Sequence, residues 1–197
     1  MSCSVNPFAS DTLFAGSFFS TKAVVTKSVG NVLMEVNNSP FLEYMHTLGI
    51  VASDGSIDGI NTIPLIVNYN DGTAPVTRAM YKVNEAGHAM CGGKIPEGST
   101  LSIGTLLYED VVAAAHSLAD ELLSLERGNV FLMYPCISRL LALGFDSETE
   151  LRAICAKLSG VTPYTISYAG GEICPVSDES GNIINRLHNF SFVTCLL

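Results

Sequence analysis

Three short motifs in the second half of the chain carry polar side chains that could recognise a small polar molecule. They are Cys136-Ile137-Ser138-Arg139, Gly170-Gly171-Glu172 and His188-Asn189. A guanidinium group binds a carboxylate or phosphate through two parallel hydrogen bonds, and glycines let backbone N–H groups approach an anion closely. We therefore predict a ligand-binding site made by the polar and glycine residues of these motifs: Cys136, Ser138, Arg139, Gly170, Gly171, Glu172, His188 and Asn189.

The sharpest version of this prediction gives the two charged residues complementary roles. Arg139 would hold the carboxylate of a zwitterionic ligand, and Glu172 would hold its amino group. Structural roles stay open beside these. Arg139 can pair with an internal acid such as Glu172, the two glycines can form a bend or β-bulge, and His188 can be a core or turn residue.

The same residues allow two other functions. Cys136 as nucleophile, His188 as base and Glu172 as the orienting acid would form the triad of a cysteine hydrolase. However, no sequence motif places Cys136 at a helix N-terminus beside a glycine elbow, and Pro135 precedes it. The other alternative is a protein–protein interaction or dimerisation module that uses a sheet edge or an apolar face. We expect a binding domain that catalyses nothing.

The charge balance argues against two classes of partner. The 197-residue chain has only ten Lys and Arg and a net charge of −9, whereas nucleic acids and anionic membranes are bound by basic patches. No apolar run reaches the eighteen or so residues of a transmembrane helix, and the first residues do not form a signal peptide. A cytoplasmic location is therefore expected.

The six cysteines do not suggest a metal site or a disulfide framework. None forms a CxxC pair or has a histidine at metal-ligand spacing, and most lie within apolar runs. We expect buried free thiols and no cofactor.

The spacing of apolar residues predicts an α+β fold, in which helices pack on a mixed, largely antiparallel sheet. The unbroken apolar run at 130–134 is expected at the centre of this sheet, because such a run is typical of a strand covered on both faces. The expected strands are 23–26, 31–36, 64–69, 78–84, 88–92, 100–107, 130–134, 164–168 and 187–196.

Three helices are expected from capping and periodicity. Ser39 as N-cap and Pro40 at the first helical position predict a short helix that ends near Gly49. Apolar residues at three- and four-residue spacing predict a long helix over 108–127. Ser147 and Glu150 match a capping box and predict a third helix up to Gly160.

Three local patterns together resemble the C-terminal FIST domain, a bacterial intracellular sensory module of signal-transduction proteins. Residues 25–36, followed by Pro40, resemble the entry hairpin of that family. Residues 134–139 resemble its strand-end motif, in which a cysteine precedes an arginine by three. Residues 168–173 and 187–189 resemble its glycine-Glu-Ile turn and its terminal Leu-His-Asn strand.

The resemblance covers residues 20–197 and implies one sensory domain, with residues 1–19 as a leader or an extra strand. It implies a small-molecule ligand, with amino acids among the candidates. The N-terminal FIST half and an output domain, which accompany this domain in the family, are not present in the sequence. An N-terminal FIST domain or a signalling output protein is therefore an expected partner, and a homo-oligomer is a further expectation.

Overall fold

The computed structural model describes residues 2–6, 22–124, 130–178 and 180–196, and it confirms the α+β class. The larger of two main sheets has eight strands in the order β6-β5-β9-β2-β3-β8-β7, with β4 paired to β3, and every pairing is antiparallel. Its strands are β2 (Ala23–Val29), β3 (Val32–Val36), β4 (Ser39–Pro40), β5 (Leu65–Asn68), β6 (Val76–Arg78), β7 (Met80–Val83), β8 (Ala89–Cys91) and β9 (Thr100–Ile103).

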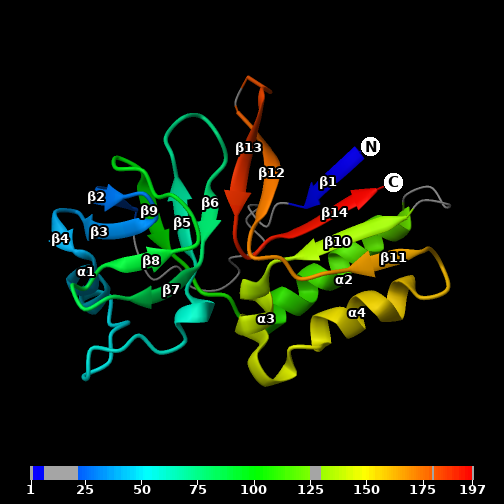
Figure 1. Cartoon of the computed structure of the whole chain (residues 1–197), viewed down its shortest axis with the longest axis horizontal. Coiled ribbons are helices and arrows are strands. Elements are labelled where there is room, and N and C mark those ends of the chain that lie inside the picture. Colours follow the sequence, from blue (N-terminus) through cyan, green and yellow to red (C-terminus); the bar gives the residue numbers. More distant parts are fainter. Residues whose placement is uncertain (1, 7–21, 125–129, 179, 197) are drawn as a thin grey trace.

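The second main sheet has the order β1-β14-β10-β11 and is mixed, because β10 pairs parallel with β11 and antiparallel with β14. Figure 1 shows α2 and α4 side by side along this sheet. The remaining elements of this half of the molecule are β1 (Ser2–Asn6), α2 (Tyr108–Ser124), β10 (Phe131–Pro135), α3 (Ile137–Leu143), the 3-10 turn Gly144–Asp146, α4 (Thr149–Leu158), β11 (Tyr164–Ile166) and β14 (Phe192–Leu196).

A two-stranded hairpin of β12 (Glu172–Ser177) and β13 (Ile183–His188) projects from the body where the two sheets meet (Figure 1). Glu172 lies opposite His188 at its base. One face of the hairpin is buried through Cys174 and Val176, whereas Ile173 and Ile183 are 71% and 73% exposed. The outer face therefore presents two apolar side chains to solvent, together with the exposed polar residues Ser177 and Asn185.

Each sheet has its own core. Strands β2, β3, β5, β8 and β9 bury their inward residues with α1 (Phe41–Thr47), whose Phe41 and Met45 are fully buried. The second core lies where α2 and α4 cover β10 and β14. Phe192 from β14 and Met133 from β10 are its fully buried strand residues. None of the helices in the described ranges is long and apolar enough to cross a bilayer.

The first hairpin is predicted correctly, and the run 130–134 forms an inner strand of the smaller main sheet, but its burial alternates along β10 instead of covering both faces. Two helix starts are wrong. Ser39 and Pro40 pair with β3, and Pro40 rather than Ser39 precedes the first residue of α1. Glu150 makes no capping box, because its carboxylate binds Arg139 in the interior instead of the start of α4. A strong buried partner here overrides a local capping pattern.

Two expected strands are each divided in the structure. The predicted strand 78–84 divides into β6 and β7 at Ala79, whose backbone N–H donates to Oδ1 of Asn189 at 3.0 Å. The predicted strand 187–196 divides into β13 and β14 at residues 189–191, where Phe190 adopts a left-handed conformation with φ +62°. The sequence analysis also missed β12 and α3. Residues 7–21, most of the predicted leader, lie outside the described ranges.

Candidate functional site

The three predicted motifs meet at the carboxyl end of β10. The backbone N–H of Cys136 donates to the carbonyl of Ser191 at 2.9 Å, and the next N–H, of Ile137, donates to the carbonyl of Ala169 at 2.8 Å. These two hydrogen bonds link the end of β10 to the segment just before Gly170 and to the segment just before β14. Main-chain hydrogen bonds therefore bring segments 136–139, 169–172 and 188–191 together.

Glu172 is the central acid of this cluster. Its side chain is buried, and Oε2 accepts a hydrogen bond of 2.5 Å from the hydroxyl of Ser191. The other oxygen, Oε1, is buried without a hydrogen-bond partner among the described residues. Burial raises the pKa of Glu172 to about 7, although the hydrogen bond from Ser191, the nearby Cys136 thiol and the charge of Arg139 act in the opposite direction.

Cys136 precedes the first residue of α3, so the thiol does lie at a helix N-terminus, which the sequence analysis did not anticipate. The residue is 1% exposed. Burial, followed by the charge of Glu172, raises the pKa of the Cys136 thiol, and hydrogen bonds from Ser138 and Phe190 only partly offset this. The thiol form therefore dominates at neutral pH, and the thiolate is the form that attacks an electrophile. Ser138 is buried beside it.

Arg139 is fully buried and ion-paired with Glu150, at 2.7 Å between Nε and Oε1. Its Nη atoms also donate to the carbonyls of Phe190 at 3.2 Å and Val111 at 3.3 Å. The guanidinium thus joins α3 to α4, α2 and the turn before β14. Of the two roles considered for Arg139, these contacts match pairing with an internal acid, with Glu150 in place of Glu172.

His188 and Asn189 are both buried, but they face different neighbours. Nε2 of His188 has no hydrogen-bond partner among the described residues, and burial lowers the pKa of this imidazole to about 4. Asn189 accepts from the N–H of Ala79, donates to the carbonyl of His188 at 3.2 Å, and lies against Gly92 and Gly171. Asn189 therefore holds the two sheets together.

The two predicted glycines differ in their surroundings. Gly170 is exposed, and a Cβ added to it would meet nothing within 4 Å. Gly171 has φ +146° and lies close to the side chains of Asn189 and Leu187, so a side chain there would be strained. Of the two glycines, only Gly171 has a backbone conformation that favours glycine.

Three neighbours of the cluster are not among the predicted site residues. Ser191 supplies the hydroxyl bound to Glu172. Tyr81 is 52% exposed, and after burial the charges of Cys136, Cys91 and Glu172 raise the pKa of its hydroxyl. Arg78 is buried and donates to backbone carbonyls, among them that of Leu187 at 2.7 Å. No local motif marks these residues, because their roles come from contacts distant in sequence.

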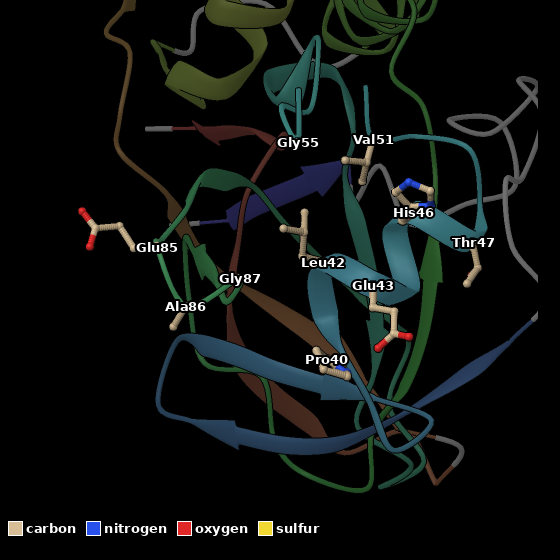
Figure 2. Close-up of a pocket in the computed structure, with 10 residues that line it drawn as sticks. All are labelled: Pro40, Leu42, Glu43, His46, Thr47, Val51, Gly55, Glu85, Ala86 and Gly87. Atoms are coloured by element: carbon tan, nitrogen blue, oxygen red, sulfur yellow. The ribbon is translucent and has the colours of Figure 1, made fainter. Parts of the chain in front are cut away.

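A separate groove lies between α1, the loop through Val51 and Gly55, and the turn 85–87, as Figure 2 shows. It has a volume of about 700 Å³, and none of the predicted residues lines it. Its polar side chains, Glu43, His46, Thr47 and Glu85, are all exposed. It therefore lacks the buried, unsatisfied polar group found at Glu172.

Within the described ranges, no group of three His, Cys, Asp or Glu side chains is arranged to hold a metal ion. The sequence model of the FIST C domain matches residues 35–175, a span that includes Cys136, Arg139 and Glu172. This chain belongs to the FIST C domain family. FIST C domains are sensory domains of signal-transduction proteins. No curated protein and no solved structure matches this FIST C domain.

Proposed function

We propose that this FIST C domain senses a small polar ligand, which binds at the Glu172 carboxyl group and is not chemically changed. The observation that carries the proposal is Oε1 of Glu172, a buried acceptor without a partner among the described residues. Leaving such an acceptor unsatisfied costs about 1–3 kcal/mol, so a ligand that donates to it recovers that free energy. Gly170, two residues before Glu172, is exposed, and Tyr81, whose pKa is raised in part by the charge of Glu172, is half-exposed.

Sensing requires that the ligand binds one state of the domain more tightly than another. The segment 189–191 is suited to report occupancy, because it contacts Glu172 through Ser191, Arg139 through Phe190 and the large sheet through Asn189. An output protein or an N-terminal FIST domain would read the change. The cytoplasmic setting and the amino-acid class of ligand stay predictions.

The raised pKa of Cys136 favours a binding role over the cysteine hydrolase, because a hydrolase needs a nucleophile activated as thiolate. His188 is a weak base when its pKa is lowered to about 4. Both observations support a domain without catalysis.

The test is a thermal-shift screen against amino acids and related metabolites, since a ligand that binds only the native state raises the melting temperature. Glu172→Gln is the informative variant, and Glu43→Gln in the groove is the matched control. A hit that is lost in Glu172→Gln and kept in Glu43→Gln supports the proposal. A hit with the opposite pattern would move the ligand to the groove and overturn the proposed site.

A second candidate function is a protein–protein interaction or dimerisation module. The specific observation in its favour is the outer face of the β12–β13 hairpin, where Ile173 and Ile183 are 71% and 73% exposed. Exposed apolar side chains on one face of a projecting hairpin are typical of interaction surfaces.

A further inference from the structure

The charge state of the empty site follows from the groups that surround Glu172. Ser191 contributes a hydroxyl, Cys136 a thiol, and Tyr81 a phenol whose pKa is raised. His188 lies opposite on β13, and its lowered pKa keeps it neutral above about pH 4. All of these neighbours are uncharged at neutral pH.

Arg139 is the cation that acts on Glu172, and its hydrogen bonds are directed elsewhere. Its Nε binds Glu150, and its Nη atoms bind Glu150 and the carbonyls of Phe190 and Val111. The charge of the guanidinium is thus balanced by Glu150 rather than by Glu172. A buried carboxylate without an adjacent cation is unfavourable, so the Glu172 carboxyl group keeps a proton in the empty site.

This arrangement discriminates between ligand charges. A protonated amine can supply the missing cation and donate to Oε1, which restores both the charge balance and the hydrogen bond. The carboxylate of a zwitterion would instead need a second cation, and Arg139 already shares its charge with Glu150. A ligand carboxylate buried beside Glu172 would be unpaired or would repel it.

Taking the proposed site as the starting point, we infer that its ligand is a primary ammonium ion without a carboxylate, and that Glu172 releases one proton to solvent when this ion binds. The exchange is balanced: R–NH₃⁺ and the neutral carboxyl group give an ammonium–carboxylate pair and one proton in bulk water. No covalent bond to the ligand forms or breaks.

Proton release makes the affinity depend on pH in a defined direction. Glu172 has a pKa of about 7 in the empty site, so below pH 7 the ion must displace a proton. The dissociation constant therefore falls about tenfold for each unit of pH up to about 7 and is level above it. An anionic ligand bound by the neutral carboxyl group would show the opposite slope.

The experiment is isothermal titration calorimetry of the whole chain with isobutylamine and with valine, which differs from it by the added carboxylate. Titrations at pH 6, 7 and 8, each in two buffers of different ionisation enthalpy, count the protons released. We expect isobutylamine to bind at least tenfold more tightly than valine. Each bound ion should release close to one proton at pH 6 and about one tenth of a proton at pH 8. Glu172→Gln abolishes the release, whereas Glu43→Gln in the separate groove retains it, which excludes a surface acid as its source.

Three results would overturn the inference. Tighter binding of valine than of isobutylamine would mean that the site holds a carboxylate. Isobutylamine binding without proton release at pH 6 would mean that Glu172 is already ionised. Absence of isobutylamine binding, alongside a Glu172-dependent hit from the metabolite screen, would remove the ammonium class and leave the proposed sensor intact. If no screened compound binds, the proposed sensor fails as well.

Discussion

Nε of Arg139 lies 2.7 Å from Oε1 of Glu150, and both side chains are completely buried. Oε2 of the same carboxylate accepts from the hydroxyl of Tyr168 at 3.2 Å, so the pair is also held from the chain after β11. We expect Arg139→Met or Glu150→Gln to lower the free energy of unfolding by about 3–5 kcal/mol, because each leaves a buried charge without its partner. Urea unfolding followed by circular dichroism measures this loss.

The surface pair of Arg152 and Asp146 provides the matched control. Its atoms are 2.9 Å apart, but the side chains are 65% and 52% exposed. Arg152→Met should therefore cost less than about 1 kcal/mol. The double variant Arg139→Met/Glu150→Leu should recover much of the single-variant loss, since both buried charges are gone. Equal losses for the buried and surface pairs would contradict the structural role of Arg139.

Glu172 should make the fold less stable as pH rises. Its pKa is about 7 in the folded chain against 4.5 ordinarily, so the folded state holds the extra proton between these values. The stability from this group is complete below pH 4.5 and is lost as pH approaches 7. Between pH 5 and 8, wild type should lose about 2–3 kcal/mol relative to Glu172→Gln in urea unfolding.

His188 titrates in the opposite direction. Its folded pKa is about 4 against 6.5 ordinarily, so its stability is present above pH 6.5 and lost as pH falls towards 4. The two groups offset each other in wild type, and Glu172→Gln should expose a decline below pH 6.5. Glu85→Gln, at an exposed turn, is the control. A constant difference between wild type and Glu172→Gln from pH 5 to 8 would refute the raised pKa.

Cys136 should resist alkylation in the folded chain. The thiol is 1% exposed and its pKa is raised, whereas Cys155 is only partly buried. With iodoacetamide at pH 7.5, we expect Cys136 to react at least about tenfold more slowly than Cys155. Mass spectrometry of the labelled peptides separates the two sites. Preferential labelling of Cys136 would restore the hydrolase alternative.

Gly92 should be far less tolerant of alanine than Gly170. A Cβ at Gly92 would lie 2.8 Å from Cγ and 2.9 Å from Nδ2 of Asn189, whereas one at Gly170 meets nothing within 4 Å. We expect Gly92→Ala to cost about 1–3 kcal/mol by overpacking, and Gly170→Ala to change stability by less than about 0.5 kcal/mol. Thermal unfolding of both variants tests the comparison. Equal tolerance would mean that Asn189 is not held against Gly92.

The outer face of the hairpin should contribute little to folding. Ile173→Ser and Ile183→Ser should each change the free energy of unfolding by less than about 0.5 kcal/mol, whereas Val176→Ala on the buried face should cost about 1 kcal/mol or more. Sedimentation velocity of the same variants examines the interaction module. A dimer in wild type that becomes a monomer in Ile173→Ser would favour that second function over the sensor.

Elements with strong periodicity were predictable from sequence, and elements set by distant partners were not. The run 130–134 and the α2 pattern follow from local spacing of apolar residues, so β10 and α2 were expected within a few residues. The break at Ala79 was not, because it depends on a carboxamide 110 positions away. The capping box at Glu150 failed for the same reason, since its partner Arg139 lies on another helix.

The membership of the candidate site was also only partly predictable. Short motifs identified Cys136, Glu172 and His188, which the structure brings to one region. The separate roles of Arg139 and Glu172 could not be predicted from the sequence, because they depend on which acid pairs with the guanidinium group. Ser191 carries no motif at all, and only the pairing of β14 with β10 places it beside Glu172.

The central position of β14 has a practical consequence for cutting this domain out of its chain. The match to the FIST C domain model ends at residue 175, midway along β12. Without the residues beyond it, β10 loses its antiparallel neighbour, Glu172 loses the hydroxyl of Ser191, and Arg139 loses the carbonyl of Phe190. At the other end, β2 starts at Ala23, before the matched segment begins. The matched segment and the folded unit thus have different borders, and a reporter fusion of this domain needs the chain from β1 through β14.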